Sequence, residues 1–303
     1  MTWTCSSAFK RRIQTMDNYV IFTDSACDIV PSLLAEWGVH CVSLAFRFNH
    51  IDQDFLNDDM PIKEFYQNMR DGKIAKTNAV NAETFRNAFE PVLADGTDIL
   101  YLGFSSGLST TFQQGKLAAE DLSEKYPDRK IIAIDTLCAS AGEGLLVKLV
   151  LDKKNAGATI EEAADYANEL IPKLAHWFTV EDLVYLKRGG RVSPAVALVG
   201  GMLNIKPVMH VDDDGHLIKV GTVRGRKQSL NILADKLLET AEDPAHGTIF
   251  ISHGDCEEDA KYLADTIKSK GGNDVQVITN VGTVIGAHSG PGTMALFFVA
   301  SQR

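Results

Sequence analysis

The stretch 100–114 (LYLGFSSGLSTTFQQ) places serines and glycines between an apolar run and a polar segment with helical spacing. This order predicts a strand that ends in a turn and leads into a helix from about Thr110. The N–H groups at a helix N-terminus lack backbone partners and lie at the positive end of the helix dipole. Together with the hydroxyls of Ser105, Ser106 and Ser109, they form a candidate anion-binding site.

A purely structural interpretation of the same serine turn is also open. The hydroxyl groups of residues 109–111 can cap the following helix. A capping box would be formed by the pair Thr110–Gln113 or by the pair Thr111–Gln114. In that case the serines bind no ligand.

A second candidate for chemistry is His288, in the segment Ile285–Gly292 (IGAHSGPG). Three glycines and a proline around one histidine predict a sharply turned loop with little bulk near the ring. A lone histidine is more often structural, and in this setting a structural ring and a ring that contacts a ligand both remain open.

The segment Gly103–Gly107 (GFSSG) also matches G-x-S-x-G, the nucleophile elbow of α/β-hydrolases. An aspartate and then His288 follow Ser105, which is the correct chain order for such a triad. However, the helix of an elbow starts directly after the nucleophile, whereas residues 107–109 intervene here. No HGGG-type oxyanion loop occurs either. A serine hydrolase that uses Ser105 and His288 therefore remains the alternative function.

Other chemistries have weak support in this 303-residue chain. Phosphate-loop, dinucleotide and H-E-x-x-H motifs are missing. The net charge of −10 argues against a nucleic-acid partner, and the longest apolar runs are too short to span a bilayer. The five cysteines lie far apart without metal-ligand spacing, which is typical of reduced thiols in the cytoplasm. The basic clusters 187–191 and 224–227 are interpreted as solvated turns or as a docking patch for an acidic partner or phosphate.

The elements that must position these residues fall into two groups. Up to residue 175, strands alternate with helices, which predicts an N-terminal parallel three-layer α/β/α domain over residues 17–175. The expected strands include Tyr19–Thr23, Val39–Phe46 and Lys130–Asp135, and the apolar run Leu145–Leu151 predicts a buried helix. Residues 1–16 contain no secretory signal and are interpreted as an extension, with Met16 a plausible natural start.

Residues 176–303 are expected to form a C-terminal domain with a mixed or antiparallel sheet. Asp213-Asp214-Gly215 lies between two apolar runs and predicts a hairpin. Pro194–Leu203 is expected to be an apolar helix, and further strands are expected at Thr248–Ser252, Val275–Thr279 and Met294–Ala300.

Taken in order, these motifs resemble the DegV family of fatty-acid-binding proteins, which includes the binding subunits of bacterial fatty acid kinase. The resemblance extends from about Tyr19 to the C-terminus. It rests on six segments in order at family-like spacing: Thr23–Ser25, Lys76-Thr77, Ser105–Ser109, Asp135-Thr136 with Ser140, Leu186–Ser193 with Lys206-Pro207, and His288–Gly292.

The resemblance implies two α/β domains with a long-chain fatty acid between them. It implies that Thr77, Ser106 and His288 hold the carboxylate, with Ser105 or Ser109 as neighbours, and that the acyl chain enters an apolar tunnel. The family presents the bound acid to a separate fatty acid kinase, whose acyl phosphate product supplies phospholipid synthesis. A cytoplasmic carrier without catalytic residues, metal or cofactor is therefore expected, and Arg191 is the residue expected to dock the kinase.

Two segments depart from the family pattern. The usual Thr-Ser-Gln-Pro is Thr77–Val80 (TNAV), and the usual Leu-Ser-Gly-Thr-Tyr is Leu108–Phe112 (LSTTF). Both segments are expected near the pocket, so chain length and saturation of the ligand do not follow from the sequence. Another carboxylated amphiphile, such as a retinoid or a bile acid, is a further alternative.

Overall fold

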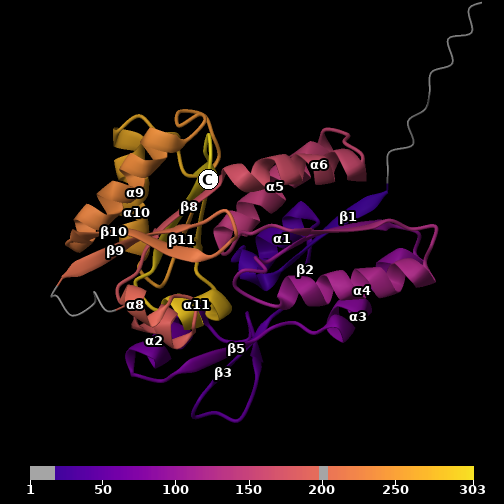
Figure 1. The fold of residues 1–303 in the computed structure, drawn as a ribbon, viewed down its shortest axis with the longest axis horizontal. Helices are drawn as coiled ribbons and strands as arrows, with labels where there is room; N and C mark the ends of the chain where they lie inside the picture. The colour runs from indigo at the N-terminus through magenta and orange to yellow at the C-terminus, as the bar shows by residue number, and fades with distance from the viewer. Residues whose placement is uncertain (1–17, 198–203) are drawn as a thin grey trace, which may run out of the picture.

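The computed structural model describes residues 18–197 and 204–303. The first half of the chain forms a four-stranded parallel sheet in the order β2-β1-β6-β7 (Figure 1). Every neighbouring pair runs parallel because a helical segment returns the chain to the same edge of the sheet. The strands are β1 (Tyr19–Asp24), β2 (His40–Val42), β6 (Asp98–Gly103) and β7 (Ile131–Asp135).

Helices cover both faces of this sheet. Ile21 on β1 packs in one buried cluster with α5 and α6, whereas the next residue, Phe22, packs with Phe85 and Phe89 of α3. Successive strand residues point to opposite faces, so both faces are buried. The predicted three-layer arrangement is confirmed. The helical segments are η1 (Ser25–Cys27), α1 (Pro31–Trp37), α3 (Ala82–Ala94), α4 (Thr111–Lys125), α5 (Ala141–Asn155), α6 (Ile160–Leu170) and η2 (Ile171–Lys173).

The second half forms a six-stranded mixed sheet in the order β10-β9-β8-β13-β11-β12. Only the pair β11–β12 is parallel, so the predicted mixed sheet is confirmed, as is the hairpin at residues 213–215 that joins β9 to β10. The elements are β8 (Leu174–Thr179), β9 (Ile205–Val211), β10 (Leu217–Arg224), α9 (Arg226–Thr240), β11 (Ile249–His253), α10 (Glu257–Ser269), β12 (Val277–Asn280) and β13 (Met294–Val299).

Helix α5 contacts both sheets. It packs against β1 and β6 of the parallel sheet and against β8, β11 and β13 of the mixed sheet (Figure 1). Leu145, Leu146 and Val150 are fully buried there. This confirms the burial predicted from the apolar run, because a helix between two sheets turns most of its surface away from solvent; its exposed residues lie in the last turn, from Asp152 on.

The predicted strand Val39–Phe46 is divided by the structure. Its first part is β2, whereas its last residues belong to a small antiparallel sheet, β4-β3-β5. The chain turns at Leu44, whose N–H donates to Ser25 Oγ (2.9 Å) and is thereby lost to either sheet. The small sheet consists of β3 (Ala45–Phe48), β4 (Phe55–Leu56) and β5 (Ala75–Asn78), with α2 (Ile62–Arg70) packed beside it.

The prediction of a loop at Ile285–Gly292, around His288, is wrong for its first residues. Residues Thr283–Ser289 form helix α11, and only Gly290–Gly292 turn. Helix α11 packs on β3, β5 and α2, so the C-terminal half contributes to a cluster built from residues 46–75. A Cβ at Gly286 would lie 2.6 Å from Tyr66 Oη, so this glycine permits close helix packing rather than a turn.

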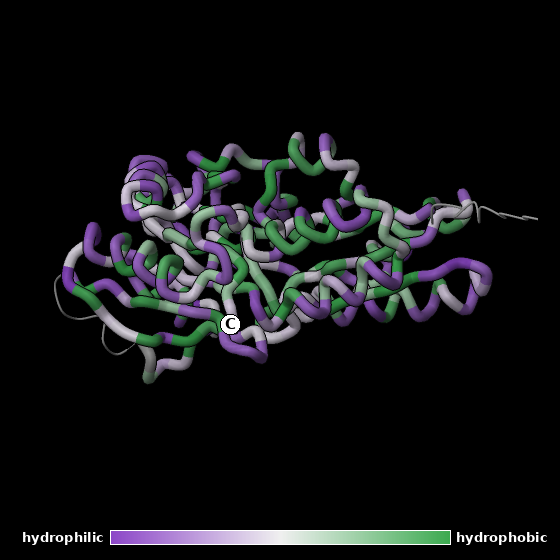
Figure 2. Tube along the Cα trace, turned by 90° about the horizontal axis from the view of Figure 1, so that it is seen from above, coloured by the Kyte–Doolittle hydropathy of each residue, from purple (hydrophilic) through white to green (hydrophobic). Residues whose placement is uncertain are grey.

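Two short helices lie before β9: α7 (Val184–Arg188) and α8 (Pro194–Ala197). The rest of the helix predicted over Pro194–Leu203 lies outside the described residues. Figure 2 shows hydrophobic segments concentrated in the interior and hydrophilic turns at the outside. Among the helices of residues 18–197 and 204–303, none combines the length and apolarity needed to cross a membrane. The expected domain limits, 17–175 and 176–303, stay a prediction.

Candidate functional site

A cavity of about 480 Å³ lies among residues from both halves of the chain. Volumes of this size are typical of pockets that enclose a small organic ligand. Most of the lining side chains are apolar, and they come from both halves of the chain, including the serine turn, the β9–β10 hairpin, β8, α7, β13 and α11. Examples are Leu44, Phe104, Leu108, Phe178, Leu186, Val211, Leu217, Val284, Ile285 and Phe297.

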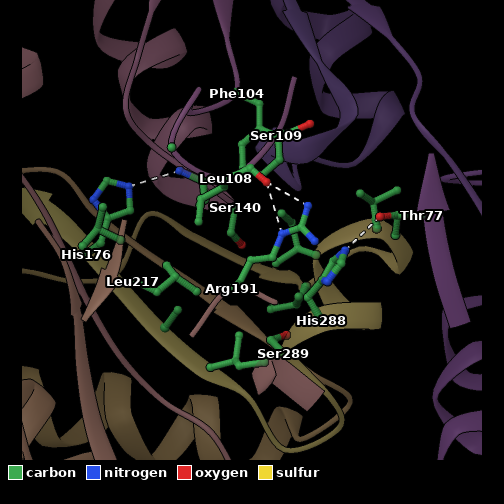
Figure 3. Close-up of a pocket in the computed structure, with 18 of the residues that line it drawn as sticks. Thr77, Phe104, Leu108, Ser109, Ser140, His176, Arg191, Leu217, His288 and Ser289 are labelled. Atoms are coloured by element: carbon green, nitrogen blue, oxygen red, sulfur yellow. Dashed lines mark hydrogen bonds between the residues drawn. The ribbon is translucent and has the colours of Figure 1, made fainter. Parts of the chain in front are cut away.

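Thr77, His288 and Arg191 lie together at one end of this cavity, which we call its polar end (Figure 3). Thr77 on β5 and His288 on α11 are joined by a hydrogen bond of 2.8 Å between Thr77 Oγ1 and His288 Nε2. They meet because α11 packs on β5. Arg191 lies beside them in the cavity wall.

The imidazole of His288 is uncharged at neutral pH. Burial lowers its pKa from 6.5 to about 4, and the positive charge of Arg191 lowers it further in the same direction. Its Nδ1 is buried without a hydrogen-bond partner among the described residues. A carboxylate that entered the cavity would meet a neutral ring and a neighbouring cation, and no repulsive charge.

Arg191 is the one charged side chain among the described residues that line the cavity. Its Nε and one terminal nitrogen donate to the carbonyl oxygen of Leu108 (3.2 and 2.9 Å), and the other terminal nitrogen donates to Gly189 O. Its guanidinium is partly buried, and desolvation lowers its pKa from the usual 12.5. Arg191 therefore joins the end of α7 to the serine turn.

The three serines of the turn have different environments. Ser106 and Ser109 line the cavity, as does Thr110. Ser109 Oγ also accepts the N–H of Thr111 (3.2 Å), which is the capping role left open above. Neither predicted capping box forms. Thr110 is the N-cap of α4, and its side chain makes no capping hydrogen bond.

Ser105 is the predicted site residue that the structure places away from the cavity. It is fully buried, and its hydroxyl donates to the carbonyl oxygen of Gly215 (3.0 Å) at the tip of the hairpin. The Ser105–His288 pair that the hydrolase alternative requires is not formed, because His288 Nε2 bonds to Thr77 instead. Ser105 therefore connects the two halves of the chain.

Asp24 is the last residue of β1 and does not line this cavity. Its carboxylate accepts from Tyr101 Oη (3.0 Å), from the N–H of Phe104 (3.0 Å) and from the N–H of Ala26 (3.1 Å), and the last of these bonds caps η1. Burial raises its pKa from 3.8 to about 6. Its role is to hold the start of the serine turn against β1.

Five polar residues among the described lining of the cavity were not predicted as site residues: Thr110, Ser140, His176, Ser289 and Thr293. Ser140 has φ 55° and ψ −150°, a conformation that residues with a side chain rarely adopt. Its hydroxyl donates to the carboxyl of Asp28 and lies 2.8 Å from Ser252 Oγ.

His176 lies across the cavity from Thr77 and His288 (Figure 3). Its Nδ1 is 2.9 Å from Leu174 O, and its Nε2 accepts the N–H of Ala139 (3.4 Å). Burial lowers its pKa well below the usual 6.5. An isolated histidine in an apolar strand carries no sequence pattern that would have predicted this position.

Metal binding has no support in the part of the chain that the structure describes. No group of three or more His, Cys, Asp or Glu side chains there could hold a metal ion. The cavity offers hydroxyl, imidazole and guanidinium donors, with no carboxylate among its described lining residues. This donor set fits an anionic group attached to an apolar body.

Known proteins resemble this chain over almost all of its length. The DegV family model matches residues 18–301. The DegV domain-containing protein CPE0026 of Clostridium perfringens is 40% identical over 289 residues, which cover 95% of this chain and 99% of that protein. The DegV domain-containing protein YteA of Lactococcus lactis is 33% identical, over 94% of this chain and 98% of its own.

Solved structures share the fold. A DegV lipid binding protein from Thermotoga maritima has a TM-score of 0.82 at 27% identity, over 94% of this chain and 99% of its own. A DegV family protein from Thermus thermophilus, described as binding fatty acid, has a TM-score of 0.84 at 26% identity, over 93% of this chain and 99% of its own. The match of the family model from residue 18 to residue 301 places this chain in the DegV family.

Proposed function

We propose that this protein binds a long-chain fatty acid, with the carboxylate at Thr77, Ser106, Ser109 and His288 and the acyl chain along the apolar wall of the cavity. The observation that carries the proposal is the charge pattern of that wall. One cation, Arg191, and several neutral donors lie at one end, while the described lining includes no carboxylate. The fatty acids bound by relatives of known structure support the same ligand class.

The acyl chain and the carboxylate of the ligand contribute differently to the binding free energy. Burial of about sixteen carbons at roughly 0.8 kcal/mol per CH₂ gives on the order of 10 kcal/mol before the costs of association. A desolvated carboxylate needs several donors to offset its lost hydration. The acyl chain therefore supplies most of the affinity, and the polar end fixes the orientation.

We further propose that the protein acts in the cytoplasm as a carrier that presents the bound acid to a separate fatty acid kinase, which forms the acyl phosphate used in phospholipid synthesis. Arg191 is the proposed docking residue, near the exposed side chains of Lys187 and Arg188. Because Arg191 also holds the serine turn, its substitution must be tested for acid binding and for kinase coupling separately.

The first experiment is mass spectrometry of an organic extract from the purified protein under denaturing conditions. We expect one fatty acid per chain, whose mass gives its length and unsaturation. A retinoid or bile acid mass would replace the proposed ligand. An empty extract, together with no heat of binding when hexadecanoic acid is titrated into delipidated protein, would refute the proposal.

A second experiment tests the carrier role. Acyl phosphate formation is measured with loaded protein, ATP and a purified fatty acid kinase catalytic subunit. Arg191→Ala is expected to lower this rate more than it lowers acid affinity. An unchanged rate at saturating acid removes Arg191 from the kinase interface, and no acyl phosphate with wild-type protein removes the carrier role.

A further inference from the structure

Gly189 lies at the end of helix α7, where a turn begins. The proposed function gives no reason why this position is a glycine. Its φ is −73° and its ψ −10°, values that any residue adopts without strain. Its neighbour Gly190 differs, because its φ of +73° favours glycine. The backbone therefore accounts for one glycine of the pair and leaves the other without a conformational reason.

The space that a side chain of Gly189 would occupy is filled by the ring of His288. A Cβ built on Gly189 would lie 2.1 Å from His288 Nδ1 and 3.1 Å from His288 Cγ and Cε1. Since ordinary contact to a Cβ begins at 3.4 Å, the ring would have to move by roughly 1 Å or more. That movement would break the 2.8 Å hydrogen bond from His288 Nε2 to Thr77 Oγ1.

The contact between α7 and α11 is reciprocal. Gly290, two residues after His288 and at the end of α11, receives the ring of Tyr185 from α7, and a Cβ at Gly290 would lie 2.4 Å from Tyr185 Cδ2. Each helix end thus has a glycine that accepts an aromatic ring from the other. The two contacts hold the ends of α7 and α11 together, so the ring of His288 has little room to move away from Gly189.

The same turn holds the serine turn. Arg191, two residues after Gly189, donates twice to Leu108 O and once to the carbonyl oxygen of Gly189. The segment 189–191 therefore contacts His288 on one side and the serine turn on the other. Both contacts lie at the polar end of the cavity (Figure 3).

We infer that Gly189 is a positioning residue of the carboxylate site: its missing side chain seats the imidazole of His288 against the end of α7 and keeps Nε2 on Thr77. The ligand in this inference rests on the proposed function, whereas the position of the ring does not. The basic cluster 187–191 thereby gains a role inside the cavity, in addition to any role on the surface.

The test is Gly189→Ala with Gly221→Ala as matched control. A Cβ at Gly221 on β10 has no heavy atom within 4 Å, and its φ is outside the left-handed region. For delipidated Gly189→Ala protein we expect a Kd for hexadecanoic acid at least tenfold higher than wild type, as loss of one hydrogen bond to a charged group requires. The control is expected to stay within twofold.

Two further readouts separate positioning from general damage. In ligand-free protein, the imidazole NMR signals of His288 are expected to shift in Gly189→Ala and to stay in place in Gly221→Ala. In a His288→Ala background, where the ring is absent, Gly189→Ala is expected to change neither the Kd nor the melting temperature further. A Gly189→Ala chain that folds poorly is expected to regain stability when His288→Ala is added.

Unmoved His288 signals, or an equal loss of affinity in both backgrounds, would overturn the inference. If wild-type protein binds no hexadecanoic acid, the proposed function fails, but the NMR signals and the melting temperatures of the four variants still decide the role of Gly189.

Discussion

Thr77 Oγ1 lies 2.8 Å from His288 Nε2, although 211 positions of sequence separate the two residues. The contact joins β5, from the first half of the chain, to α11, near its end. It sets the polar end of the cavity because both side chains line it and neither carries a charge at neutral pH.

Removal of the Thr77 hydroxyl is expected to weaken acid binding without loss of fold. Thr77→Val keeps the shape of the side chain but takes away one hydrogen bond to the carboxylate, for which about 1.5–3 kcal/mol, or roughly ten- to a hundredfold in Kd, is expected. Calorimetric titration with hexadecanoic acid measures it. Thr77→Ser restores the hydroxyl and is expected to bind nearly as well as wild type; equal weakness of both variants would contradict a hydrogen-bonding role.

Alanine substitution is expected to lower the stability of the protein at Ser105 and the affinity for the acid at Ser106. The Ser105 hydroxyl donates to Gly215 O and accepts the N–H of Gly107, so Ser105→Ala leaves buried groups unpaired and is expected to cost about 1–3 kcal/mol of unfolding free energy. Ser106 lines the cavity, so Ser106→Ala is expected to weaken acid binding and leave stability nearly unchanged. Urea unfolding and titration of both variants provide the comparison, and a larger affinity loss for Ser105→Ala would reverse the assignment.

Acid binding is expected to take up protons through His288. The ring has a pKa of about 4 in the empty cavity, and a carboxylate beside it favours the charged imidazole and raises that pKa. Affinity therefore increases as pH falls from the pKa of the bound state towards about 4, the pKa of the empty site. Titration at pH 6 in two buffers with different ionisation enthalpies measures the uptake. His288→Gln is expected to take up none; proton release by wild type would contradict the site.

Asp28 is expected to make the protein less stable as pH rises. Burial raises the pKa of its carboxyl from 3.8 to about 8, so the folded state holds a proton that the unfolded state loses between these values. The stabilisation is complete below pH 3.8 and is lost as pH rises through about 8, with a slope of roughly 1 kcal/mol per pH unit.

Asp28→Asn tests this dependence because the amide keeps the shape and has no proton to lose. Urea unfolding at pH 5, 6 and 7 is expected to show a smaller decline of stability for Asp28→Asn than for wild type. Asp52→Asn, at a side chain that is 99% exposed, serves as control and is expected to follow wild type. Parallel declines in all three proteins would mean that Asp28 is ionised when buried.

Local patterns in the sequence determined the parallel sheet, the hairpin and the burial of α5. Alternating strands and helices, an Asp-Gly turn and a helix apolar on nearly all sides each reflect interactions between near neighbours in the chain or the solvent-exposed fraction of one element. Such features need no knowledge of which distant segment packs where.

The function of single side chains required the tertiary structure. Ser105 and Ser106 are adjacent and identical in type, yet one bonds to the hairpin tip and the other lines the cavity, because the docked hairpin occupies one side of the turn. No spacing rule distinguishes them.

The segment around His288 is a second case in which the sequence pattern did not reveal which distant residues a segment contacts. Its glycines predicted a loop, but Gly286 lies inside helix α11, where it admits Tyr66 from α2, and only Gly290–Gly292 turn. The sequence by itself determined the family, the layers and most of the residues near the polar end. Only the tertiary structure decided which of them face the cavity, because side-chain direction depends on contacts with segments up to 211 positions away.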